Sequence, residues 1–200
     1  MDRAELGREL VALLADLVAI PSTYPPGDTA PIARHCADFL SALGYESRVL
    51  GGNCVARRGK GSPSLVFNAH ADTVDVGERK AWGTDPFKAT LVDGKVYGLG
   101  ACNSKSAMAV HLWLARQIAP KRGEVVFTFV GDEENLGPNG LAHLRKTSAV
   151  KPTTLVVAAQ TRNRLVLEER GVMWVRIHAR GRAAHAGAPR NGESAILKMI

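Results

Sequence analysis

Two polar segments follow apolar runs and carry residue types that bind metals or move protons. His70 and Asp72 follow the apolar residues 65–67, and a Glu-Glu pair at residues 133–134 follows the apolar residues 125–130. Each run has the length and the β-forming composition of a buried strand. Chemistry in open α/β sheets gathers at the carboxyl ends of strands, so we expect these side chains to share one sheet edge. The pattern favours part of a two-metal hydrolase site.

Such a site needs a carboxylate that bridges the two ions. Two divalent ions about 3.5–4 Å apart repel each other by roughly 5 kcal/mol even in water. A bridging carboxylate offsets this repulsion with its negative charge and gives one oxygen to each ion. Each ion takes further histidine or carboxylate ligands and keeps a position open for water. A second carboxylate then accepts the proton of that water, and a donor stabilises the oxyanion that develops on the attacked carbonyl.

The elements that must position these residues alternate along the chain. Apolar periodicity predicts helices at residues 6–20, 29–43, 104–117 and 140–146. Runs of β-forming residues predict strands at residues 46–50, 54–57, 65–68, 125–130 and 154–158. This alternation predicts an α/β fold with three layers around a mostly parallel sheet.

From about residue 165 the pattern changes. Residues 172–179 alternate like a half-exposed strand, and residues 181–189 form a loop of small residues. Residues 194–200 begin a helix that has no stop signal, so we expect the chain to be cut short or completed by another chain.

Composition excludes several classes of protein. The formal net charge is +7, but the basic residues are scattered and no aromatic stacking pattern accompanies them, which argues against a nucleic-acid partner. No apolar run reaches 18 residues, and the mixed-charge amino terminus is unlike a signal peptide, so we expect no membrane partner. Three widely spaced cysteines predict free thiols in a reducing cytoplasm.

Five motifs in consistent order carry a family resemblance. They lie at residues 70–74 (His-Ala-Asp-Thr-Val), 82–87, 97–105, 132–140 and 181–189. In these motifs the chain resembles the amino-terminal half of the M20 metallopeptidase and amidohydrolase family, the group of acetylornithine deacetylase, succinyl-diaminopimelate desuccinylase and carboxypeptidase G2. The resemblance implies a zinc-exopeptidase-like catalytic domain at residues 1–168, two Zn²⁺ per site, and the beginning of a lid or dimerisation domain at residues 169–200.

The resemblance also implies roles for single residues. His70 would bind the first metal ion while Asp72 orients its ring, and Glu134 would bind the second ion. Glu133 would be the general base. His185, in the lid, would donate to the substrate carbonyl, often across a dimer.

The implied substrate is an N-acyl amino acid or a small peptide with a free carboxylate. Arg190 and Asn191 fall where the family often holds substrate carboxylates. The lid implies a homodimer as the assembly.

Three departures from the family pattern affect the metal site. The bridging position is Asn103, whose neutral amide cannot replace a bridging carboxylate well. Ala159 stands where the family has a carboxylate ligand of the first metal ion. The last metal-binding histidine of the family lies beyond the part that this chain matches. Of the five usual ligands, His70 and Glu134 remain.

Three interpretations therefore compete. The first is an active metal-dependent amide hydrolase with altered ligands, or one completed by another chain. The second is a degenerate, catalytically silent relative that serves as a binding or dimerising module. The third is an engineered or incomplete form of an active enzyme. Ligand loss in two separate motifs favours an inactive or impaired scaffold. The intact Glu133 and Glu134 argue against a long period of mutation without selection, because a silent site has no evident reason to keep both carboxylates. Whether the chain is an enzyme stays open.

Overall fold

The structure is a computed structural model that describes residues 2–162, 164–168 and 170–200. The chain forms two compact units, Met1–Asn163 and Arg164–Ile200. The expected domain boundary between residues 168 and 169 touches residue 169, which lies outside the described residues.

The first unit is built on a five-stranded sheet in the order β2-β3-β8-β4-β9. These strands are β2 (Glu46–Leu50), β3 (Asn53–Lys60), β4 (Ser64–His70), β8 (Gly123–Val130) and β9 (Thr154–Val157). β4 pairs in parallel with β8 and β9, whereas β3 is antiparallel to β2 and β8. Four of the five strands therefore run in one direction, which confirms the expected α/β fold around a mostly parallel sheet.

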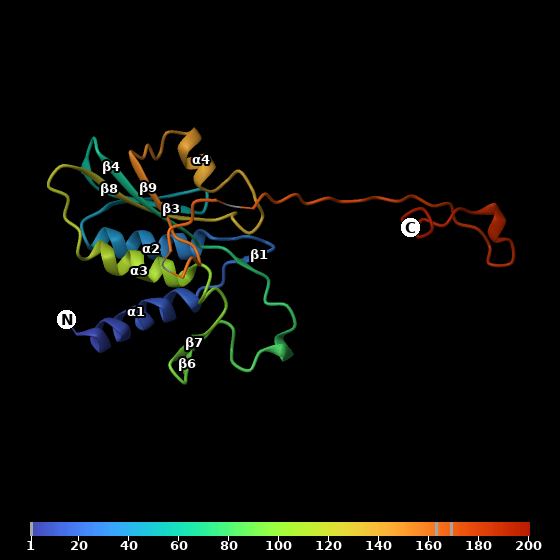
Figure 1. The fold of residues 1–200 in the computed structure, drawn as a ribbon, viewed down its shortest axis with the longest axis horizontal. Helices are drawn as coiled ribbons and strands as arrows, with labels where there is room; N and C mark the ends of the chain where they lie inside the picture. The colour runs from blue at the N-terminus through green and yellow to red at the C-terminus, as the bar shows by residue number, and fades with distance from the viewer. Residues whose placement is uncertain (1, 163, 169) are drawn as a thin grey trace. The chain divides into compact units, whose positions relative to one another are not determined.

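Helices cover both faces of this sheet (Figure 1). They are α1 (Arg3–Val18), α2 (Ala30–Ala42) and α3 (Lys105–Ala115) on one face and the short α4 (Leu141–Lys146) on the other. Alternation along β8 explains the three layers, because successive side chains point to opposite faces. Phe127 and Phe129 pack with the three long helices, whereas Val126 and Val130 pack with Leu144 of α4.

Local sequence signals set the helix ends. Asp2 caps α1, because its carboxylate accepts the N–H of Glu5 at 2.7 Å. Pro31 lies in the first turn of α2, where no backbone donor is needed, and Gly44 follows the helix with a φ of 83°. The helices therefore begin and end within a few residues of the predicted limits.

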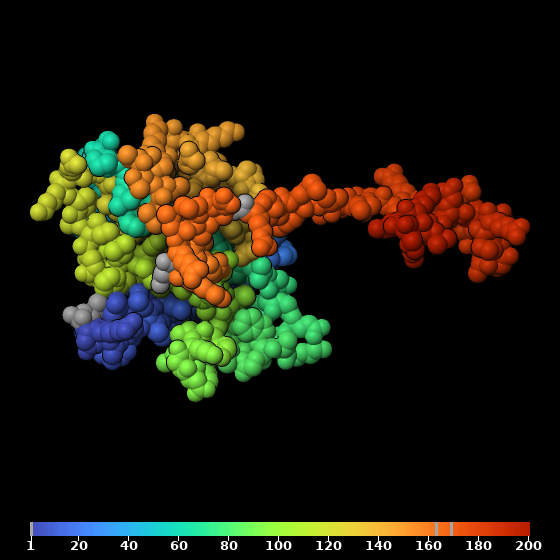
Figure 2. All heavy atoms as spheres, viewed as in Figure 1, coloured from blue at the N-terminus to red at the C-terminus, as the bar shows by residue number. Residues whose placement is uncertain are grey.

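Smaller elements connect the layers. β1 (Thr23–Tyr24) pairs in parallel with β5 (Thr73–Val74), which is the end of the His70 motif. The segment beyond it contains the short η1 (Arg79–Ala81) and the hairpin of β6 (Thr90–Val92) and β7 (Lys95–Tyr97). This hairpin, in lime green, projects from the surface of the first unit (Figure 2). The sequence analysis did not predict it.

Residues 164–168 and 170–200 of the second unit contain little regular structure. Arg182 and Glu193 exchange two backbone hydrogen bonds of 2.9 Å, and η2 (Pro189–Asn191) lies between them. The strand predicted at residues 172–179 is wrong, because within residues 170–200 that segment has no strand partner and its apolar side chains are exposed. The helix predicted at residues 194–200 is a turn, in which Lys198 donates to Ser194 O at 3.2 Å.

Among the described residues, no helix combines the length and the apolar character that crossing a membrane would require.

Candidate metal centre

His70 ends β4 at the carboxyl edge of the sheet. It pairs in register with Val130, the last residue of β8, so the Glu-Glu pair lies just beyond the neighbouring strand. His70 and Glu134 are partly or fully buried, whereas Glu133 is exposed. The parallel pairing of two predicted strands therefore brings the two predicted polar segments together.

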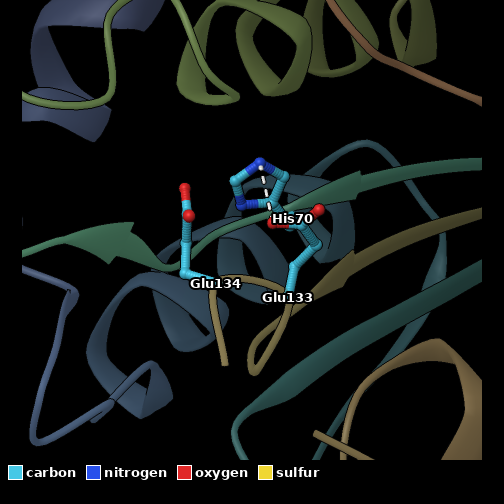
Figure 3. Close-up of side chains that lie close together, drawn as sticks. All are labelled: His70, Glu133 and Glu134. Atoms are coloured by element: carbon cyan, nitrogen blue, oxygen red, sulfur yellow. Dashed lines mark ion pairs between the residues drawn. The ribbon is translucent and has the colours of Figure 1, made fainter. Parts of the chain in front are cut away.

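The side chains of His70, Glu133 and Glu134 form one cluster. Each offers a ligand atom, and these atoms all lie within 4.8 Å of one another. His70 Nε2 lies 3.8 Å from Glu133 Oε2. Figure 3 shows the two carboxylates on opposite sides of the His70 ring. One nitrogen and two carboxylates in this arrangement suit a divalent metal ion of the zinc class.

Asp72 holds both segments in place. Its backbone carbonyl lies 3.0 Å from His70 Nδ1, and its Oδ1 lies 3.4 Å from the same nitrogen. Its Oδ2 accepts the backbone N–H of Glu134 at 2.9 Å. With 1% of its surface exposed, Asp72 fixes the orientation of the imidazole and the start of the Glu134 loop at once.

Asn103 lies at the predicted bridging position and contacts His70 directly. Its Oδ1 is 2.9 Å from His70 Nε2, the nitrogen that Asp72 leaves available. It precedes α3, and Lys105 in the first turn of that helix is 1% exposed and donates from Nζ to Ile20 O at 2.8 Å. Asn103 thus stands beside the cluster with one neutral oxygen toward the histidine.

Ala159 lies at the same edge of the sheet. Asn68 of β4 pairs with Val157 of β9, and Ala158 donates to Asn68 O at 2.9 Å. Ala159 therefore follows the end of β9 by two residues, at the edge of the sheet where His70 ends β4. A methyl group at this position supplies no ligand.

The charges in the cluster shift the pKa values of three groups. Burial by itself would lower the pKa of His70. The hydrogen bonds to Asp72 and Asn103 and the charge of Glu133 outweigh burial and raise the pKa of His70 to about 9. Burial by itself would raise the pKa of Asp72, yet the facing imidazole of His70 and the hydrogen bond from the Glu134 backbone leave it below its usual value. Burial and the neighbouring carboxylates raise the pKa of Glu134.

Asn53, which the sequence analysis did not single out, and Asp132, the first residue of the motif at 132–140, brace the loop after β8. Asn53 is 1% exposed; its Nδ2 donates to Asn139 O at 2.9 Å, and its Oδ1 accepts from Gly131 N at 3.0 Å. Asp132 has a φ of 71°, and its carboxylate accepts from Asn135 Nδ2 and Asn139 N, each at 3.0 Å. An Asp followed by Asn and Gly was the available signal of such a turn.

The remaining predicted site residues belong to the second unit. His185 is exposed, and its Nδ1 accepts the N–H of Gly187 at 3.1 Å. Arg190 and Asn191 lie on η2. Their roles stay predictions.

The residues present do not fit a two-ion centre. Asn103 offers one neutral oxygen where a bridge needs two charged ones, and Ala159 offers none. Within the described residues, the only cluster of three or more histidine, cysteine or acidic ligands is that of His70, Glu133 and Glu134. Two ions against two cluster carboxylates would leave a net charge of +2, so repulsion between the ions would remain uncompensated.

The α/β sheet of the first unit thus presents a histidine and two carboxylates at its carboxyl edge, a set of donors that could hold a metal ion. The model of Peptidase family M20/M25/M40 matches residues 66–165, and the model of the Peptidase dimerisation domain matches residues 167–200. The first match covers half of the chain, which therefore belongs to the M20/M25/M40 peptidase family.

Curated relatives agree with this assignment, and a solved structure shares the fold. Succinyl-diaminopimelate desuccinylase of Acidiphilium cryptum is 33% identical over 203 residues, which are 95% of this chain and 54% of the relative. The enzyme of that name from Legionella pneumophila (strain Lens) is 30% identical, over 96% of this chain and 55% of its own length. Human carnosine dipeptidase 1 shares the fold, with a TM-score of 0.64 and 23% identity over 78% of this chain and 39% of its own. The chain thus spans about half the length of the curated relatives it matches.

Proposed function

We propose that this chain carries the scaffold of a metal-dependent amide or peptide hydrolase whose two-ion site is degenerate, so that the chain is inactive or impaired as a hydrolase. One contact supports this most strongly: the amide oxygen of Asn103, instead of a carboxylate, lies 2.9 Å from the Nε2 of His70. The methyl group of Ala159 at the same sheet edge supports it further.

The proposed substrate class is an N-acyl amino acid or a small peptide. The relatives named as desuccinylases favour the N-acyl form. In this proposal zinc is the metal, Glu133 is the group placed to accept a proton from water, and His185 is the donor to the carbonyl. Arg190 and Asn191 hold the carboxylate of the substrate, and the match to a dimerisation domain supports a homodimer.

Two alternatives have support of their own. The convergence of His70, Glu133 and Glu134 within 4.8 Å favours an active deacylase or peptidase with altered ligands, or one completed by another chain. The dimerisation match at residues 167–200 favours a non-catalytic binding or dimerising module. Hydrolysis of a peptide or an N-acyl amino acid separates them, because only the first is catalytic.

Zinc titration by calorimetry tests the proposal on the purified chain and on a variant that carries Asn103→Asp and Ala159→Glu. We expect the variant to bind more zinc ions per chain than the unmodified protein, because two carboxylates are restored. Two tightly bound ions in the unmodified chain would refute the degeneracy.

A further inference from the structure

We infer that the centre holds a single divalent ion of the zinc class, bound by His70 Nε2 and by the carboxylates of both Glu133 and Glu134, with Asn103 Oδ1 as a fourth donor. This inference rests on the proposed degeneracy of the two-ion site. It changes the role of Glu133, which becomes a metal ligand instead of a general base.

The spacing of the donors supports one ion. Zinc bonds of about 2.0–2.2 Å to nitrogen and oxygen put two ligand atoms of a tetrahedral ion roughly 3.4 Å apart. His70 Nε2 lies 2.9 Å from Asn103 Oδ1 and 3.8 Å from Glu133 Oε2. The cluster of three donors spans at most 4.8 Å. The side chain of Glu133 is 55% exposed, so small rotations are free to close this distance.

The charge of the cluster also supports one ion. A neutral imidazole with two carboxylates balances a single divalent ion, and Asn103 adds an oxygen without adding charge. The family pattern reaches its charge balance for two ions through carboxylates at the positions of Asn103 and Ala159. Without those carboxylates, the two negative charges of Glu133 and Glu134 balance the charge of one divalent ion only.

A buried, unpartnered oxygen points to the same site. Asp72 is 1% exposed, and its Oδ1 has no hydrogen-bond partner although it lies 3.4 Å from His70 Nδ1. A metal-bound imidazole keeps its proton on the nitrogen away from the metal and donates it to such a carboxylate. Asp72 therefore holds the imidazole of His70 in the orientation that metal binding through Nε2 requires.

The test uses zinc sulfate, calorimetry and four proteins: the unmodified chain, Glu133→Gln, Glu134→Gln, and Glu46→Gln as a control in an exposed carboxylate of β2. We expect one ion per unmodified chain and unchanged affinity in the control. Glu133→Gln and Glu134→Gln should each bind zinc at least about 100-fold more weakly, because each variant loses a direct metal ligand. Loss of a residue that only contacts a ligand weakens metal binding by about 10–100-fold, and loss of the ligand itself weakens it more. Circular dichroism and the absorption bands of bound cobalt(II) report folding and ligand set independently of activity.

The outcomes separate the inference from the proposed function. One ion with equal affinity in the chain and in Glu133→Gln would overturn the ligand role of Glu133 and leave the degeneracy standing. No zinc binding up to millimolar concentration would overturn the one-ion site, again without touching the degeneracy. Two tightly bound ions in the unmodified chain would overturn both.

Discussion

The backbone N–H of Glu134 donates to the carboxylate of Asp72 over 2.9 Å, which ties the loop after β8 to the end of β4. The same carboxylate faces His70 Nδ1. One buried side chain therefore sets the distance between the histidine and the Glu-Glu pair, and a change at Asp72 affects both.

Replacing Asp72 with Asn should weaken zinc binding by about 10–100-fold, because an amide cannot accept the imidazole proton as a carboxylate does. Loss of the charged acceptor should also lower the free energy of unfolding by about 1–3 kcal/mol. Calorimetric zinc titration and urea denaturation measure the two effects. The exposed Asp75→Asn is the matched control. Unchanged affinity in Asp72→Asn would show that Asp72 does not orient the histidine.

The sequence predicted the strands that carry the site, because buried strands are continuous apolar runs that end in polar residues. It also predicted His70, Asp72 and Glu134 as neighbours, since parallel strands end at one edge. It did not predict that β3 lies reversed between β2 and β8, because the partner of a strand is decided by contacts far apart in the sequence.

The missed hairpin had a local signal. Asp93 and Gly94 join β6 to β7 with φ values of 48° and 73°, the positive φ pair of a type I′ turn. At residues 172–179 the alternating pattern predicted a strand that the structure does not contain. Alternation alone does not form a strand, because a strand needs a partner to pair with. The bracing role of Asn53 was beyond prediction, since its partners Gly131 and Asn139 are distant in the sequence.

The loop that carries the Glu-Glu pair requires a glycine at position 137. A Cβ there would lie 1.9 Å from Asp132 Oδ2, whose carboxylate is held by Asn135 and Asn139. Gly137→Ala should therefore cost about 1–3 kcal/mol of stability and weaken zinc binding, because the carboxylate must move. Gly7→Ala is the control: nothing lies within 4 Å of its Cβ, and alanine in α1 should stabilise by about 0.5–1 kcal/mol. Equal unfolding midpoints for the two variants would contradict this explanation.

Asn53→Ala should destabilise the first unit by about 1–3 kcal/mol, because the substitution leaves the buried N–H of Gly131 and the carbonyl of Asn139 without partners. Thermal unfolding measures this loss. Asn191→Ala, in the second unit, is a control in which the same side chain is removed from an exposed position. A stability loss no larger than that of the control would show that the loop is not braced by Asn53.

His111 makes the first unit sensitive to acid. Its ring is 6% exposed and lies 5.5 Å from the ring of Phe67, and burial lowers its pKa to about 4. The unfolded chain therefore takes up the proton first, near pH 6.5, and stability is lost as the pH falls from about 6.5 toward 4. The full loss amounts to about 3 kcal/mol.

His111→Phe should remove this acid sensitivity. Between pH 6.5 and pH 5 the unfolding free energy of the variant should fall by about 2 kcal/mol less than that of the unmodified chain. Urea denaturation at the two pH values measures the difference, with the exposed His143→Gln as control. An identical loss in both proteins would mean that other groups cause the acid effect.

Anomalous diffraction at the zinc edge, from crystals of the unmodified chain grown with excess zinc, tests the degenerate centre most directly. We predict one anomalous peak, within bonding distance of His70, Glu133 and Glu134. Two peaks about 3.5–4 Å apart, the second beside Asn103 and Ala159, would contradict the degeneracy and restore a two-ion hydrolase site.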